Sequence, residues 1–225
     1  MERHFDQELK ELKQELLTMG SLVEVAVHNA VSSLIARDSG LAEKTVRDDE
    51  SVNNLEITIE KRCLELLALQ QPVAADLRFI VSALQIIKDL ERMGDQAVNI
   101  AERAIILNQE PLVKPFIDLP KMALQVQSMV KDSLDSFVNR DVMKARNVCE
   151  RDDQVDNYNE KIFRELLSIM IKDQATISRA VYLILVGRSL ERIADHATNI
   201  AEDVIYMVEA RTIKHHAEEK EQSTL

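Results

Sequence analysis

The segments KDLERMGDQAVNIAE, residues 88–102, and RSLERIADHATNIAE, residues 188–202, are two copies of one sequence. Nine of the fifteen positions are identical at a constant separation of 100 residues. A match of this length within one chain indicates an internal duplication. The sequence therefore predicts two similar halves, each organised around one copy of this segment.

Each copy has the periodicity of an amphipathic helix. Glu91 and Asp95 are one helical turn apart, so their carboxylates share a patch of surface and repel each other. At about 100° per residue, this acidic strip lies beside the apolar face of the helix. The apolar positions of the first copy recur at helical spacing without an intervening proline: Leu90, Met93, Ala97, Ile100 and Ala104.

Working outward from the two copies, the same periodicity predicts an all-α protein of two tandem three-helix bundles with six long antiparallel helices. Four glycines and four prolines in 225 residues leave few turns. The first bundle is predicted over 1–108 and the second over 121–212, with a proline-containing linker at 109–120 and a charged tail at 213–225. The six helices are expected at 4–38, 41–69, 73–108, 121–139, 142–171 and 174–211.

The second helix of each half carries another oxygen-rich strip. Asp49 and Asn53 are one turn apart, and Asp152 and Asp156 repeat this spacing in the second half. Oxygen ligands of this kind suit hard cations such as magnesium, calcium, manganese and ferric iron. If the strips of neighbouring helices face each other, each half gathers several carboxylates. A solvated or arginine-paired strip is the alternative interpretation of the same pattern, because Arg92 could reach the neighbouring acids.

Composition argues against several other classes of protein. A formal net charge of −11 disfavours nucleic-acid binding. The two cysteines form neither a disulfide framework nor a zinc motif, so we expect buried thiols in a reducing compartment. The charged N-terminus does not resemble a signal peptide, and no apolar run is long enough to cross a membrane. We therefore expect a cytoplasmic protein.

Enzymatic motifs are missing from the sequence. It has no Glu-x-x-His pair, no glycine-rich phosphate loop and no recognised nucleophile motif. His196, which stands where the first copy has Gln96, is expected on the exposed side of its helix. We therefore predict that the protein is not an enzyme, and a metal-dependent phosphoesterase stays a minor alternative.

The doubled ERMGD and ERIAD motifs, each followed by NIAE, resemble the acidic signatures of PhoU proteins, which regulate phosphate uptake. The Asp49 and Asp152 segments, the segment PVAADLR at 72–78 and the chain length are also similar to that family. The resemblance covers about residues 5–215. It implies tandem three-helix bundles, often paired as homodimers.

The resemblance also implies a non-enzymatic adaptor between the ATPase of a phosphate ABC transporter and a sensor histidine kinase. Such an adaptor damps phosphate-starvation signalling and is only peripheral to the membrane complex. Iron or zinc is the implied metal, with manganese or magnesium as alternatives, and Asn99 and Asn199 are additional candidates. The implied ligands are Asp49, Asn53, Glu91, Asp95, Asp152, Asp156, Glu191 and Asp195.

Overall fold

The computed structural model describes residues 4–115 and 117–210. The described chain is built of helices, which confirms the all-α prediction. The elements are α1 (His4–Ile35), α2 (Ser39–Asp48), α3 (Glu50–Gln70), α4 (Ala74–Asn108), α5 (Asp118–Asn139), α6 (Val142–Glu150), α7 (Asp152–Lys172), the short 3₁₀ helix η1 (Gln174–Thr176) and α8 (Ile177–Glu209).

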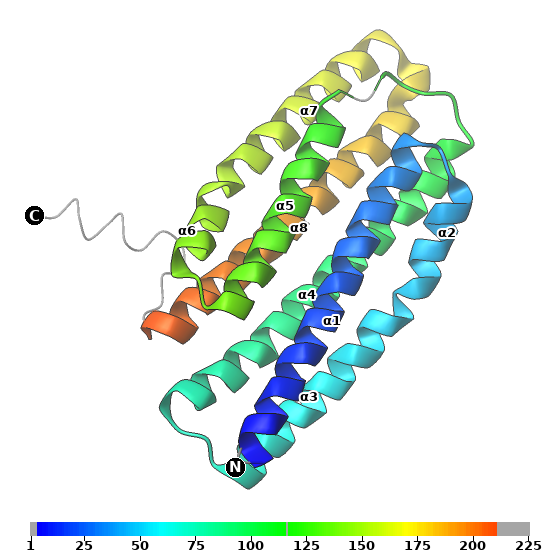
Figure 1. Ribbon diagram of the computed structural model, residues 1–225. Helices are drawn as coiled ribbons and strands as arrows, with labels where there is room; N and C mark the ends of the chain where they lie inside the picture. Colours follow the sequence, from blue (N-terminus) through cyan, green and yellow to red (C-terminus); the bar gives the residue numbers. More distant parts are fainter. Residues whose placement is uncertain (1–3, 116, 211–225) are drawn as a thin grey trace, which may run out of the picture.

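The helices form two three-helix units that lie side by side along their long axes (Figure 1). In the first unit α1, the pair α2–α3 and α4 run up, down and up. In the second unit α5, the pair α6–α7 and α8 repeat this path in the opposite direction. The units meet where α4 packs against α8 and α1 packs against α5. The pairs α2–α3 and α6–α7 therefore lie on the two outer flanks.

The way in which α4 and α8 are aligned indicates that an approximate twofold axis relates the two halves. Asp89 contacts His196, and Arg78 donates a hydrogen bond to the backbone oxygen of Met207 at 3.1 Å. In antiparallel helices, this register brings residue 92 and its twin 192 to the same level. A pocket of about 660 Å³ between α1 and α5 is lined by pairs of equivalent positions from the two helices, including Val27 with Val130. The axis therefore passes through both inter-unit contacts.

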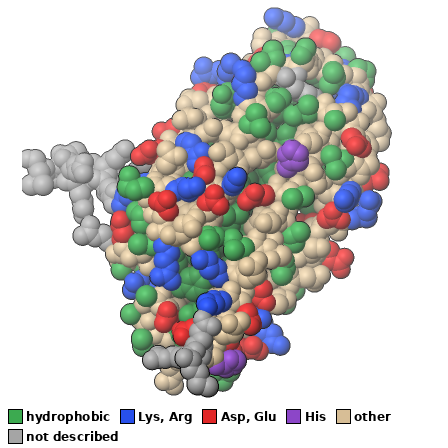
Figure 2. Space-filling view, viewed as in Figure 1, with side chains coloured by type: hydrophobic (Ala, Val, Ile, Leu, Met, Phe, Trp, Pro, Cys, Tyr) green, Lys and Arg blue, Asp and Glu red, His purple; other side chains and the backbone are tan. Residues whose placement is uncertain are grey.

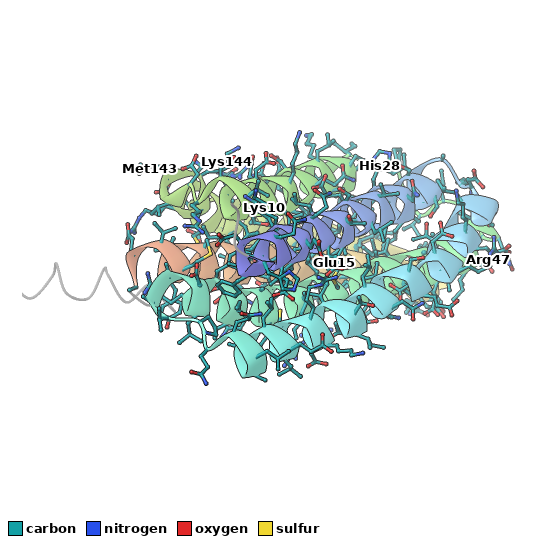
Figure 3. The ribbon with its side chains drawn as sticks, turned by 60° about the horizontal axis from the view of Figure 1, so that its bottom comes forward. Lys10, Glu15, His28, Arg47, Met143 and Lys144 are labelled. Carbon is teal, nitrogen blue, oxygen red and sulfur yellow. The ribbon has the colours of Figure 1, made fainter. Side chains whose placement is uncertain are left out.

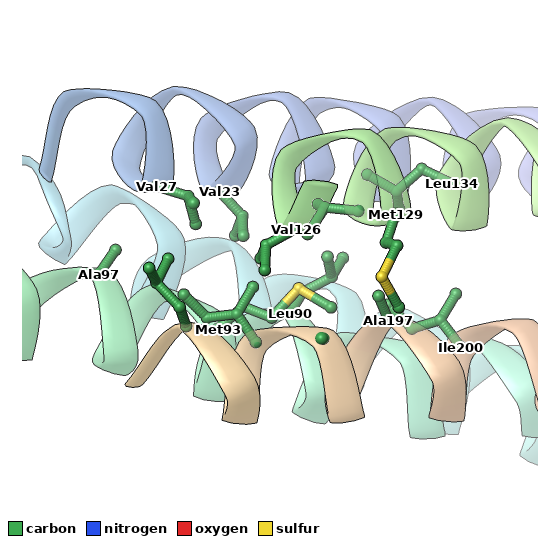
Figure 4. Packing of buried hydrophobic residues seen from close by; sticks show 14 of the residues in the cluster. Val23, Val27, Leu90, Met93, Ala97, Val126, Met129, Leu134, Ala197 and Ile200 are labelled. Carbon is green, nitrogen blue, oxygen red and sulfur yellow. The ribbon is translucent and has the colours of Figure 1, made fainter. Parts of the chain in front are cut away.

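One hydrophobic core runs through both units. Figure 4 shows Val23 of α1, Val126 of α5, Leu90 of α4 and Ile200 of α8 directed into the same interior. The apolar face predicted for the first copy is fully buried, as is the corresponding face of the second copy. Burial of such side chains stabilises the fold by about 1.5–3 kcal/mol each. Most charged side chains point outward, as the sticks in Figure 3 show.

The predicted helices 41–69 and 142–171 are each interrupted once, which the sequence pattern did not indicate. Asp49 separates α2 from α3, and Arg151 separates α6 from α7. Both residues keep right-handed helical backbone angles, so the chain bends slightly and continues. The first interruption is at Asp49, the first acidic residue of its strip, and the second directly precedes Asp152, the equivalent residue of the other strip.

The turns before α2 and α6 are duplicated in detail. Arg37 and Arg140 adopt left-handed backbone angles, with φ of 57° and 53°. The following residues, Asp38 and Asp141, cap the next helix by accepting a backbone hydrogen bond at 3.0 Å. The two halves therefore have the same arginine–aspartate turn as well as the same pattern of buried helix faces.

The segment that joins the units is shorter than the predicted linker 109–120. Helix α5 begins at Asp118, so Pro120 lies in its first turn, where a proline needs no backbone hydrogen-bond donor. The segment is attached to both units. Arg37 donates to the backbone oxygen of Glu110 at 2.7 Å, Arg179 donates to that of Pro111 at 2.8 Å, and Lys114 pairs with Glu165. The predicted tail 213–225 lies outside the described residues.

Two further expectations concern the thiols and the membrane. Cys63 is buried, Cys149 is half-buried, and both are free thiols, in agreement with the sequence. Burial raises the pKa of each thiol to about 12. Within the described residues, the helices contain no stretch that has both the length and the apolar character of a membrane span.

Candidate functional site

The acidic strips of each half lie against each other between the second and third helices of the unit. In the first unit, α3 begins beside the middle of α4, and in the second unit α7 begins beside the middle of α8. The twin clusters are thus on opposite flanks of the molecule. The face of the molecule that Figure 2 shows carries side chains of both signs of charge.

In the first unit, four carboxylates interact electrostatically. Burial raises the pKa of Asp49, and the charge of Asp95 adds to this effect. Burial likewise raises the pKa of Glu91, with further contributions from Asp95, Glu56 and Asp49. Asn53 differs from its acidic neighbours because its amide donates to Asp49 Oδ2 at 3.0 Å. The predicted residues of this half therefore lie together, and Glu56 joins them.

In the second unit, the equivalent cluster is fully acidic. Burial and the charges of Asp195 and Asp156 raise the pKa of Asp152 to about 6. Burial, followed by neighbouring carboxylates, also raises the pKa of Glu191, although Asn159 donates to Glu191 Oε2 at 2.8 Å. The pKa values of Asp156 and Asp195 are raised as well, mainly by burial. Four carboxylates therefore repel one another in a partly buried place.

Two buried oxygen atoms at equivalent positions have no hydrogen-bond partner in the described protein. They are Asp49 Oδ1 and Asp152 Oδ1. A buried carboxylate oxygen without a partner is costly, so it indicates a place where a proton, a water molecule or a cation compensates. Gly94 allows the close approach on the first side, because a Cβ atom there would lie 3.0 Å from Asp49 Oδ1. The donor set therefore fits a hard cation in its chemistry.

The side chains do not form a preassembled chelate. Among the described residues, no group of three or more acidic, histidine or cysteine side chains converges closely enough to hold one ion. Metal binding would require the carboxylates to turn toward a shared ion, which rotation about their side-chain bonds permits. The structure thus brings the predicted residues of each half together without fixing a coordination geometry.

The expectation for His196 is wrong. Its side chain is only 15% exposed, and its Nδ1 lies 2.8 Å from Asp89 Oδ1 across the contact between α4 and α8. Asn199 donates to the same oxygen at 3.2 Å. Helical geometry placed His196 away from the acidic strip, but α4 covers that side of α8. Asp89 has a serine as its twin, and this difference between the copies was the signal that could have identified it.

Fold and site together define a class: an all-α protein of two duplicated three-helix units, each with a carboxylate cluster between its second and third helices. A family model described as the PhoU domain matches residues 16–104 and again residues 119–204. These two matches correspond to the two halves. The chain belongs to the PhoU family.

Relatives of known name are similar over nearly their whole length. A phosphate-specific transport system accessory protein PhoU homolog from Aquifex aeolicus is 44% identical over 214 residues, which are 95% of this chain and 97% of the relative. The homolog of the same name from Pseudomonas aeruginosa is 42% identical, over 95% and 88% of the two chains.

Solved structures of the family have the same fold. The crystal structure of PhoU from Pseudomonas aeruginosa superimposes with a TM-score of 0.89 at 43% identity, covering 92% of this chain and 100% of that chain. The structure of the phosphate transport system regulatory protein PhoU from Streptococcus pneumoniae gives a TM-score of 0.86 at 32% identity, covering 94% of this chain and 100% of that chain.

Proposed function

We propose that this chain is a non-enzymatic cytoplasmic regulator of phosphate uptake and phosphate-starvation signalling. It acts as a metal-binding adaptor between the ATPase of a phosphate ABC transporter and a sensor histidine kinase. The observation that carries the proposal is the family match in both halves, together with relatives that are named as accessory proteins of phosphate-specific transport. Family membership supports a role in the regulation of phosphate transport, and the adaptor and the metal are the finer steps of the proposal.

The proposed role of the metal follows from the electrostatics of the two clusters. Partly buried carboxylates raise one another's pKa, so each cluster is destabilising at neutral pH while its charges are uncompensated. A divalent or trivalent cation would cancel this repulsion and fix the position of α3 against α4 and of α7 against α8. When bound, iron, zinc, manganese or magnesium would supply positive charge and no redox or hydrolytic step.

The two proposed sites differ in strength. Glu91, Asp95 and Asp49 would hold the metal in the first unit, where Asn53 provides a neutral amide. Four carboxylates would hold it in the second unit, where Asp156 stands at the position of Asn53. Because carboxylates bind hard cations more strongly than amides do, the second site is expected to bind the metal more tightly. The proposed ligands of the second site are Asp152, Asp156, Glu191 and Asp195.

The adaptor role is tested by affinity capture under phosphate-replete conditions. The full chain with a small peptide tag should recover the transporter ATPase and the sensor kinase from cells that contain the phosphate transport system. A strain that lacks the chain should express its phosphate-starvation genes even with abundant phosphate. Recovery of neither component, with normal repression in the deletion strain, would contradict the proposal.

The metal is tested separately by elemental analysis of untagged protein. We expect bound metal after purification without chelators, and we expect chelation to lower the melting temperature. Asp152→Asn should reduce the metal content more than Asn53→Ala does. Protein without metal, whose melting is unchanged by chelation, would instead support a helical scaffold with solvated acidic strips.

Two remaining parts of the proposal have direct measurements. Light scattering in solution tests the homodimer, which should give twice the chain mass. Incubation of the metal-loaded protein with a generic phosphate ester tests the phosphoesterase alternative, for which we expect no turnover above the rate of the free metal. The Nδ1 atom of His196, the residue that follows Asp195, lies 2.8 Å from Asp89 Oδ1, outside the cluster.

A further inference from the structure

A groove open to solvent runs between α1 and α5, which lie side by side in the front of Figure 1. It is the pocket of about 660 Å³ described above, lined by residues within 21–29 and 124–131, and we call it the α1–α5 groove. Val27 and Val130 are buried in its lining. Val25 and Leu124 also line it, with 55% and 67% of their surface exposed. The groove therefore presents apolar side chains to solvent between two helices.

The packing of α1 against α5 is close at one end of the groove. Gly20 accommodates the side chain of Leu134, because a Cβ atom at Gly20 would lie only 2.7 Å from Leu134 Cδ1. The groove begins next to this contact, where its lining includes the short side chains of Ser21 and Ser128. These hydroxyl side chains do not fill the space between the helices. The groove is thus a consequence of the residues that the two helices present there.

Two charged side chains line opposite walls of the groove, Glu24 on α1 and Lys131 on α5. Glu24 is half-buried and Lys131 is exposed. Within the described residues, neither makes a hydrogen bond or an ion pair. Burial raises the pKa of Glu24, Lys131 counteracts this effect, and Asp135, which has Lys144 at 3.5 Å, adds to it. Glu24 is therefore a carboxylate held partly out of water, with a cation in range but none in contact.

We propose that the α1–α5 groove binds an amphipathic helix of a partner protein, with apolar side chains between Val25 and Leu124 and a lysine or arginine beside Glu24. Two helical walls with apolar side chains between them form the surface used in helix-in-groove recognition. The bound helix contributes anchors spaced three, four and seven residues apart. Such a helix would cover the two exposed apolar side chains, which otherwise face water.

The charge of the bound helix follows from the burial of Glu24. A charge pair is stronger where water is partly excluded, so pairing at the half-buried Glu24 contributes more than pairing at the exposed Lys131. The chain as a whole has a formal net charge of −11, which also attracts a basic partner. The groove therefore favours a helix that is apolar on one side and basic beside it.

The dimensions of the groove favour a single helix over a second copy of this chain. Its lining comes from the two short stretches 21–29 and 124–131. Each side of a stable protein–protein interface contributes roughly 20–30 residues, which is more than this groove provides. A stretch of nine residues on α1 is about 12 Å long, which two to three turns of a bound helix would span.

This inference deepens the proposed adaptor role, on which it rests for the identity of the natural helix. The groove lies between the two units, whereas the acidic clusters lie on the outer flanks. Its lining includes none of the proposed metal ligands. Peptide binding to the purified chain and affinity capture from cells can therefore fail independently of each other.

The experiment is fluorescence anisotropy with the chelator-treated, full-length chain and two labelled model peptides of about four helical turns. Both peptides carry leucines at positions i, i+3 and i+7 in an alanine background. One has lysines beside the leucines, and the other has glutamates there. We expect the lysine peptide to bind saturably and the glutamate peptide not to bind. Glu24→Gln should weaken binding of the lysine peptide by about fivefold, and Leu124→Ser by about tenfold.

Each variant has a matched control outside the groove. Glu43→Gln removes the same charge from the exposed surface of α2. Met143→Ser removes an apolar side chain of α6 that is 76% exposed. Neither control should change the affinity by more than about twofold. Thermal melting checks the fold of all four variants, and the exposed position of Leu124 makes its variant the safer one.

Several results would overturn the proposal. One is the absence of saturable binding of the lysine peptide below ~1 mM. Another is equal binding of the glutamate peptide, or equal losses in the groove variants and their controls. Conversion of a dimer into a monomer by Leu124→Ser, measured by light scattering, would also overturn it, because the groove would then be a contact between two copies of the chain.

Discussion

Replacement of Asp152 by asparagine should stabilise the metal-free protein at neutral pH. The folded-state pKa of about 6 lies above the ordinary value of 3.8. At about 1.4 kcal/mol per pH unit, this difference corresponds to an upper bound of about 3 kcal/mol. Because the carboxyl group is partly exposed, screening by solvent reduces the expected gain to about 1–2 kcal/mol. Asparagine keeps the shape of the side chain and removes the charge.

The gain should depend on pH with a defined sign. Between pH 3.8 and about 6 the folded protein holds a proton on Asp152 that the unfolded chain releases. Lowering the pH through this range therefore removes the destabilisation in the wild type, and raising it above 6 restores the full effect. The difference between variant and wild type should be largest at pH 7 and near zero at about pH 4.

The assay is urea unfolding followed by circular dichroism, with chelator present, at several values of pH. A gain of 1–2 kcal/mol corresponds to about 2–8 °C in melting temperature for a chain of this size. Asp132→Asn is the control, and its effect on the free energy of unfolding is expected to have the opposite sign. Although burial alone would raise the pKa of Asp132, the hydrogen bond and charge of Arg151 lower it. That variant should be less stable at pH 7, and its deficit should shrink as the pH falls.

Two results would refute this reasoning. The first is a metal-free Asp152→Asn protein that is less stable than the wild type at pH 7. The second is a difference in stability that stays constant from pH 7 to pH 4. Either result would show that Asp152 is compensated in the metal-free state. With metal bound, the same variant is expected to be the less stable protein, because it has lost a ligand.

Three further predictions concern the core, the contact between the units and the thiols. Leu90→Ala should lower the free energy of unfolding by about 2–5 kcal/mol in urea titrations, because the side chain is fully buried; a loss below about 1 kcal/mol would contradict the shared core. In a double-mutant cycle, His196→Gln and Asp89→Ser should show a coupling of about 1 kcal/mol, and purely additive effects would exclude the hydrogen bond. Cys63 and Cys149 should react with a thiol reagent at pH 8 far more slowly in the native protein than in urea, because burial raises the pKa of both thiols to about 12; equal rates would contradict their burial.

The local pattern of apolar and charged residues predicted the helices and their buried and acidic faces well. The buried face of α4 follows from the spacing of Leu90 and Met93, and the acidic strip follows from Glu91 and Asp95, because helical periodicity depends only on the backbone. The interruptions at Asp49 and Arg151 were missed, since neither involves a proline or glycine. That the oxygen-rich strips face each other was only a condition in the sequence analysis, because residue spacing does not say how two helices pack. Spacing also could not show that the carboxylates do not converge on one point.

The sequence by itself determined that the chain consists of two duplicated helical halves. It also determined that each half carries carboxylate side chains beside its apolar helix face. Only the tertiary structure decided how the halves meet. The register of α4 against α8 buries His196 beside Asp89, which lies 107 residues away in the chain. Periodicity specifies which side of a helix is apolar, whereas packing of the shared core selects the neighbour and the register. The charges that meet between the units follow from that choice.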